Sequence, residues 1–229
     1  MAALFLILTG IFALACAGAL WRYSKPERRG VSLLVLVVWI VYCGVLGYSG
    51  RVSDTSQQVP GLFLLVGPTI LFTLLFTMHA SYARELALKL PMALLIWLHV
   101  VRLPVELFLH GLWKAQLVPR TVTFEGTNFD ILTGVTAPII AFLVVRGKAQ
   151  RTLLYVWNIL GLLLLFNVVI RGVLSAPGPL QRIFDDYPNQ GLLLFPYVYL
   201  PGFIVPMVLT LHILALRALG AQEKDSAHQ

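Results

Sequence analysis

The stretch of sequence that decides the fold is Pro91–Trp113, PMALLIWLHVVRLPVELFLHGLW. It is long enough to cross a bilayer, because a transmembrane helix needs about 20 mostly apolar residues. This apolar run nevertheless carries four ionisable residues, His99, Arg102, Glu106 and His110. A charged side chain near the bilayer centre costs roughly 3 kcal/mol, and such residues usually mark a pathway, a proton relay or a binding site. We therefore expect a membrane helix that carries a polar site.

The composition is that of a membrane protein. Of the 229 residues, 59% are hydrophobic and 12% are charged, about half of the usual charged share of ~25%. The mean hydropathy is +0.84. A soluble chain of this size could not bury so much apolar surface. Cys16 and Cys43 lie in apolar runs without a CxxC pattern, so we expect small buried residues that indicate nothing about redox compartment.

Seven apolar runs are candidates for membrane spans. They are Ala3–Trp21, Ser32–Gly50, Gly61–Met78, Pro91–Trp113, Ile131–Arg146, Leu153–Arg171 and Gly191–Leu216. Alternating ten-residue strands are absent from the sequence, so a barrel is excluded. The sequence predicts an all-α polytopic membrane protein, a seven-helix bundle formed by residues 1–219 with a polar tail at 220–229. We also expect a short amphipathic helix within Ala80–Leu90.

The basic residues are shared unevenly between the two sets of alternating loops. One set holds eleven: Arg22, Lys25, Arg28, Arg29, Arg84, Lys89, Arg146, Lys148, Arg151, Arg217 and Lys224. The other set holds five: Arg51, Lys114, Arg120, Arg171 and Arg182. The positive-inside rule then predicts an outside N-terminus and a cytoplasmic C-terminus in a plasma membrane, and the short loops favour a bacterial inner membrane. The net charge of +7 needs no nucleic-acid partner, since the sequence has no basic face with interleaved aromatics.

The four ionisable residues of Pro91–Trp113 share one helix face, within an arc of roughly 80°. Pro104 lies among them and removes one backbone donor, so we expect a kink. Two interpretations stay open. In the first, a polar cavity opens outward and Glu106 and His110 exchange protons or bind a cation. In the second, Arg102 and Glu106 neutralise each other and hold helices together.

A polar loop, Thr121–Asp130 (TVTFEGTNFD), follows this run. Its aromatic residues would anchor it at the membrane surface, and Gly126 can supply a positive φ. That placement puts Glu125, Asn128 and Asp130 over the outer mouth of the cluster. Asp130 also suits the N-cap of the next helix.

The last run is irregular in its outer half, where it contains Pro196, Pro201, Gly202 and Pro206. This pattern predicts a kinked or partly unwound segment, which membranes tolerate where it is buried in protein or lines a cavity. Tyr197 in this segment suits either the cavity or the outer aromatic belt.

No motif identifies a cofactor. His and acidic side chains can ligate zinc, but no HxxxH or HExxH spacing supports a metal site. His79 and His212 lie at similar depth, which would suit a haem, but interfacial histidines more often cap helices or snorkel. Asn158 and Asn167 point about 180° apart and fit hydrogen bonds between helices.

We therefore expect an outward-facing pocket between Pro91–Trp113, the loop that follows it and the last run. Its candidate residues are Arg102, Glu106, His110, Glu125, Asn128, Asp130 and Tyr197. Binding, sensing or transport of a small solute or ion is the leading hypothesis. A membrane-embedded enzyme with Glu106 and His110 as acid and base stays open, and so does an accessory subunit. Beyond the lipid bilayer, the sequence leaves a homo-oligomer or a membrane partner subunit open.

The asymmetry of basic residues makes a prediction about topology. A reporter that is active only in the cytoplasm should be active when fused after Gln229, and a cysteine placed near Asp54 should be labelled from outside. Protection of that cysteine together with an inactive reporter would reverse the orientation.

Overall fold

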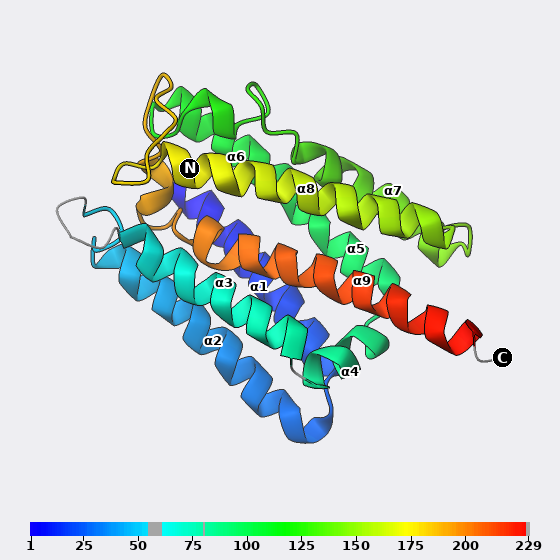
Figure 1. The fold of residues 1–229 in the computed structure, drawn as a ribbon. Helices are drawn as coiled ribbons and strands as arrows, with labels where there is room; N and C mark the ends of the chain where they lie inside the picture. The colour runs from blue at the N-terminus through cyan, green and yellow to red at the C-terminus, as the bar shows by residue number, and fades with distance from the viewer. Residues whose placement is uncertain (55–60, 80, 228–229) are drawn as a thin grey trace.

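The computed structural model describes residues 1–54, 61–79 and 81–227; the side chains of residues 78–79 and 222–227 lie outside this description. The described chain forms an all-α bundle (Figure 1), which confirms the predicted class. Its α-helices are α1 (Ala2–Tyr23), α2 (Pro26–Tyr48), α3 (Gly61–His79), α4 (Ser81–Lys89), α5 (Met92–Trp97), α6 (Arg102–Lys114), α7 (Ile131–Val145), α8 (Arg151–Ser175) and α9 (Val205–Ala227). The short helix expected within Ala80–Leu90 is present as α4.

In the described part of the chain, five helical segments are long and apolar enough to cross a membrane: α1, α2, Met92–Lys114, α8 and Leu200–Ala221. A sixth would result if α3 and α4, which are bent by 74° at their junction, form one span. The fifth predicted run, Ile131–Arg146, corresponds to α7, which has 15 residues and is shorter than a typical span. The chain is thus a multi-span helical membrane protein. Seven spans and the outside N-terminus stay predictions.

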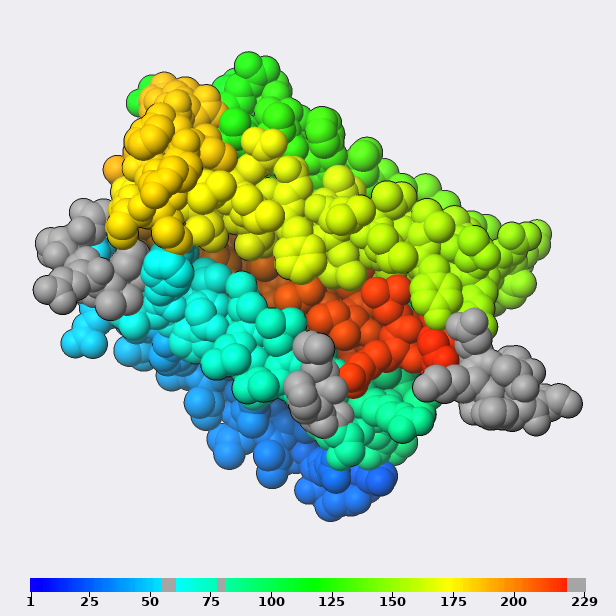
Figure 2. Space-filling view, in the orientation of Figure 1, coloured from blue at the N-terminus to red at the C-terminus, as the bar shows by residue number. Residues whose placement is uncertain are grey.

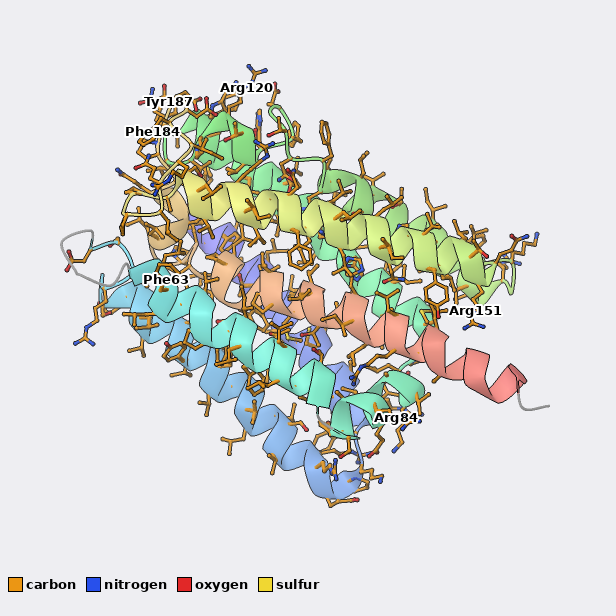
Figure 3. All side chains as sticks on the ribbon, viewed as in Figure 1. Phe63, Arg84, Arg120, Arg151, Phe184 and Tyr187 are labelled. Atoms are coloured by element: carbon orange, nitrogen blue, oxygen red, sulfur yellow. The ribbon has the colours of Figure 1, made fainter. Side chains whose placement is uncertain are left out.

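The ends of the bundle carry different loops. The start of α1 and the end of α9 lie at opposite ends of the bundle (Figure 1). Arg120, Phe184 and Tyr187 lie together at one end, and Arg84 and Arg151 lie toward the other (Figure 3). This separation agrees with the two sets of alternating loops that the sequence predicts.

Helix α9 is the centre of the bundle and contacts α3, α4, α5 and α8. The span Leu200–Ala221 includes the first part of α9, and 72% of its most apolar stretch is buried inside the protein. The corresponding share for α2 is 17%. A peripheral helix such as α2 therefore faces lipid with most of its apolar surface, whereas α9 is available to hold polar groups inside the protein.

Two spans are distorted where their prolines lie. A 3₁₀ turn, η1 (Leu98–Val101), separates α5 from α6, directly before Pro104. This confirms the expected distortion, because Pro104 has no N–H to donate to the carbonyl of Val100. The distortion thus lies within one span, between α5 and α6.

The last span begins later than predicted. The chain forms a 3₁₀ turn at η3 (Gly191–Leu193) and becomes helical only in the π-helix η4 (Leu200–Ile204), which continues into α9. The predicted start at Gly191 is therefore wrong, and the unwound outer half is confirmed. Because prolines cannot donate backbone hydrogen bonds, this half lacks a regular ladder. The carbonyl of Gly202 accepts a hydrogen bond from Trp39 Nε1 at 2.8 Å, which ties η4 to α2.

Glycine is required where α7 approaches α6. A Cβ at Gly134 would lie 2.6 Å from the backbone nitrogen of Leu103, whereas a Cβ at Gly18 would meet nothing within 4 Å. We expect Gly134→Ala to lower the free energy of unfolding by about 1–3 kcal/mol, because it forces α6 and α7 apart. The matched Gly18→Ala variant should be neutral or stabilising by up to ~1 kcal/mol. Unfolding of the purified protein in a denaturing detergent measures both, and equal effects would contradict this packing.

Candidate functional site

Arg102 and Asp130 form a buried ion pair between α6 and the start of α7. Arg102 Nε donates to Asp130 Oδ2 at 2.6 Å, and a second guanidinium nitrogen donates to Oδ1. Arg102 is 2% exposed and Asp130 is 5% exposed. Asp130 occupies the N-cap position of α7, but its carboxylate makes no capping hydrogen bond. Of the two interpretations left open by the sequence, the one in which Arg102 and Glu106 neutralise each other is therefore contradicted, because Asp130 binds the guanidinium with both oxygens, the strongest arrangement for such an ion pair.

Two further partners surround the guanidinium of Arg102. It lies 3.1 Å from His212 Nε2 and donates to the carbonyl of Gly161 at 3.2 Å. His212 Nδ1 lies 2.9 Å from Asn158 Oδ1, and Asn158 donates in turn to the carbonyl of Leu154 at 2.8 Å. Arg102 thus links α6 to α7, α8 and α9.

His212 is fully buried, so the prediction of an interfacial histidine is wrong. It faces the interior because α9 lies at the centre of the bundle. A Cβ at Gly161 would lie 2.5 Å from the His212 ring, so glycine is needed for α8 to come this close. The predicted interhelical role of Asn158 is confirmed. Asn167 donates to the carbonyl of Thr127 at 2.8 Å, so it ties α8 to the polar loop.

His99 packs beside the ion pair without entering it. Its ring lies 4.0 Å from the ring of His212 and 5.3 Å, edge to face, from Trp157. Within the described part of the chain, neither His99 nitrogen has a hydrogen-bond partner. The side chain of His79 lies outside the described residues, and so does the haem pair that it would form with His212.

Glu106 is held by the polar loop. Asn128 Nδ2 lies 2.7 Å and 2.9 Å from the two oxygens of Glu106 and also donates to the carbonyl of Val122. Asn128 Oδ1 accepts a hydrogen bond from the backbone N–H of Asp130 at 2.9 Å. Among the described residues, no Lys or Arg forms a salt bridge with Glu106. Glu106 is therefore a buried carboxyl group that is anchored by an amide and lies outside the ion pair of Arg102 and Asp130.

The loop reaches Glu106 because Gly126 lets the backbone double back. Gly126 is not among the described glycines with positive φ, so that expectation is wrong. A Cβ there would lie 2.3 Å from the carbonyl oxygen of Arg120, and this contact is the reason that the position needs glycine.

The loop of residues 176–190 covers the polar loop Thr121–Asp130. Asp186 accepts hydrogen bonds from Trp113 Nε1 at 2.7 Å and from the backbone N–H of Arg120 at 3.0 Å. Burial raises the pKa of Asp186, but these hydrogen bonds outweigh it and hold the pKa below its usual range. The ionised Asp186 carboxylate therefore stabilises the contact between the two loops above the ordinary carboxyl pKa. This stabilisation is lost as the pH falls through the lowered pKa of Asp186.

Three of the seven predicted site residues do not join the network. His110 is half-buried and stacks on Phe124 at 5.0 Å, and no hydrogen bond among the described residues joins it to Glu106. Glu125 is exposed. Tyr197 is buried against Phe5, with the rings 5.3 Å apart. The structure thus brings together Arg102, Glu106, Asn128 and Asp130.

A cavity of about 100 Å³ borders the network. Glu106 and Asp130 lie in its wall, together with apolar side chains such as Val66, Phe166 and Leu209. It lies between α3, α6, α8 and α9, on the side where α9 is visible between α3 and α8 in Figure 2. At the loop end it is bounded in part by Val122, Asn189 and Leu193. In the described part of the chain, no group of three His, Cys, Asp or Glu residues could hold a metal ion.

The ion pair predicts an energetic coupling that can be measured. Arg102→Leu or Asp130→Leu alone should cost about 3–5 kcal/mol, because each leaves an unpaired buried charge. The double variant should cost much less than the sum of the two single losses. The same cycle with Glu106→Leu in place of Asp130→Leu is the control and should show far weaker coupling. Detergent-induced unfolding measures all variants, and stronger coupling to Glu106 would contradict the observed pairing.

The comparisons with known proteins place the chain in a family but assign no activity. No curated protein and no solved structure matches the chain. A family model described as a domain of unknown function, DUF8737, matches residues 59–220. The whole buried network, from Arg102 to His212, lies within the matched residues, whereas α1 and α2 precede them. The protein belongs to the DUF8737 family.

Proposed function

We propose that this protein binds a proton or a small cation at Glu106 within the membrane, and that it senses or transports that ion. The observation that carries the proposal is a carboxyl group, 1% exposed, that faces a cavity and has no cationic partner among the described residues. The other charges of the network do not serve this group, because Arg102 is already bound by both oxygens of Asp130.

The buried charge of Glu106 favours an ion as its ligand. Placing an ion in a low-dielectric interior costs several kcal/mol unless a partner compensates it. Arg102 and Asp130 compensate each other, whereas the only hydrogen-bond donor to Glu106 in the described chain is the neutral amide of Asn128. A proton or a small cation supplies the missing compensation. The amide also holds the carboxyl group in one orientation toward the cavity.

The size of the cavity limits the ligand. Pockets for organic ligands usually have volumes of ~300–1,000 Å³. The cavity beside Glu106 has about 100 Å³, which suits a small ion with a few waters. Apart from Glu106, Asp130 and Asn189, its walls are almost entirely apolar, so they offer little to a polar organic solute.

The same network provides a route from the ion to the helices. Hydrogen bonds run from Glu106 through Asn128 to the backbone of Asp130, whose carboxylate binds Arg102. Arg102 in turn contacts His212 of α9. A change of charge at Glu106 therefore acts on groups that hold α6, α7, α8 and α9 together. Pro201 and Pro206 of the irregular last span line the cavity, and unwound segments of this kind are common at ion sites of transporters.

The proposed access is from the outside. The two loops that cover this end of the bundle belong to the set with five basic residues, which the positive-inside rule assigns to the outer face. The proposal keeps the plasma membrane and the seven spans predicted from the sequence.

Infrared difference spectroscopy of the protein in lipid nanodiscs tests the proposal. Perfusion with buffers of different pH, Na⁺ or K⁺ should change a carboxyl band of the wild-type protein. Glu106→Gln keeps the shape and removes the charge, so it should abolish this change and weaken ion binding by about tenfold or more. The matched control is Glu27→Gln, which removes an exposed carboxyl group from the first turn of α2 and should keep the band change.

Two results would contradict the proposal. In the first, folded Glu106→Gln protein shows the same ion-dependent band as the wild type. In the second, the wild-type spectrum responds to neither pH nor the two cations.

A further inference from the structure

We propose that a second and larger cavity binds one acyl chain of an anionic membrane phospholipid, with the phosphate group at Arg28. This cavity has about 470 Å³ and lies between α1, α2, α3, α4, the region of α5 and η1, and α9. Neither Glu106 nor Asp130 lies in its wall, so it is separate from the proposed ion site.

The interior of this cavity suits a hydrocarbon chain. Its wall is formed mainly by apolar side chains, among them Leu36, Trp39, Phe72, Phe203 and Leu214. Along α2 it extends from Arg28 to Trp39, which is about 16 Å at the helical rise of 1.5 Å per residue. An elongated apolar space of this length fits a chain better than it fits a compact ring.

One end of the cavity is polar. The hydroxyl group of Tyr82 lies 2.8 Å from Ser32 Oγ and also contacts the hydroxyl of Ser24. The guanidinium of Arg28 lies over the Tyr82 ring, 5.3 Å from its centroid. Among the described residues, no carboxylate forms a salt bridge with Arg28. A guanidinium group without a carboxylate partner in the described chain, beside these three hydroxyl groups, is the chemistry that recognises a phosphate group.

The cavity is accessible from the side of the bundle. Val31 and Val35 of α2 and Phe72 of α3 line it and are 64%, 40% and 45% exposed. In a bilayer these side chains face lipid, so an acyl chain can enter between α2 and α3 without crossing the protein. The occupant is therefore a molecule already present in the membrane.

The charge of the surroundings favours an anionic headgroup. Four basic residues flank the turn between α1 and α2: Arg22 lies in the last turn of α1, Lys25 between the helices, and Arg28 and Arg29 at the start of α2. Basic residues at a membrane surface attract anionic lipids, and the orientation predicted from the sequence puts this turn at the cytoplasmic leaflet, where such lipids are found. An anionic phospholipid satisfies the apolar interior and the basic end together.

Native mass spectrometry of the purified full-length protein tests the proposal. The protein in detergent is mixed with equal amounts of phosphatidylglycerol and phosphatidylcholine that carry the same acyl chains. We expect one bound phosphatidylglycerol, preferred over phosphatidylcholine. Arg28→Gln should weaken its retention by about fivefold. The matched control is Arg22→Gln, which removes the same charge from the end of α1, outside the cavity wall, and should keep the preference.

A second variant tests whether the chain enters the cavity. Thr73 is 4% exposed and lines the wall, so Thr73→Trp should fill the space and abolish lipid retention, while a thermal melt reports whether the protein is still folded. Unchanged retention in folded Thr73→Trp protein, or equal retention of both lipids by the wild type, would overturn the proposal. Displacement of phosphatidylglycerol by an equal amount of a free fatty acid would also overturn it, because a carboxylate would then be the recognised headgroup.

Discussion

The structure depends on one constraint: the guanidinium of Arg102 lies inside the membrane domain and must be compensated there. Asp130 supplies the charge with both carboxylate oxygens, and His212 and the carbonyl of Gly161 occupy further sides. An ion pair of this kind adds little net stability compared with apolar packing, but removing one partner is strongly destabilising. The pair therefore determines which helices must be adjacent, because Arg102, Asp130 and their two further partners come from α6, the start of α7, α8 and α9.

The functional site follows from how this pair is made. Since Asp130 binds Arg102, the charge of Glu106 is left without a cation among the described residues. The loop that ends at Asp130 also carries Asn128, which holds Glu106 through its side-chain amide. The ion pair and the ion site thus share one short segment, and a proton or cation at Glu106 acts on the groups that organise the helices.

The sequence was sufficient to predict the all-α membrane class, the polar span and four members of the network. Apolar runs and intramembrane charges are local signals, so they can be read without knowledge of helix packing. The partner of Arg102 could not be predicted, because helical spacing placed Glu106 on the same face whereas Asp130 arrives through the fold of a loop.

The position of His212 was missed for a similar reason. Its depth was inferred from a span that began at Gly191, but the prolines delay the helix until Leu200. Its burial then depends on α9 being the central helix, which no local pattern reports. The available signals were a histidine inside an apolar run and a glycine inside another such run. Gly161 is that glycine, and only the packed structure pairs the two positions.

The central claim is that Arg102 is satisfied by Asp130 and that Glu106 is thereby left for an ion. A cryo-electron microscopy map of the protein in lipid nanodiscs, at a resolution that separates side chains and ordered waters, tests it most directly. The account predicts continuous density between Arg102 and Asp130, Asn128 against Glu106, and a peak for a water or an ion beside the Glu106 carboxyl group. A map with Glu106 bound to Arg102, and with side chains filling the space beside it, would contradict the account.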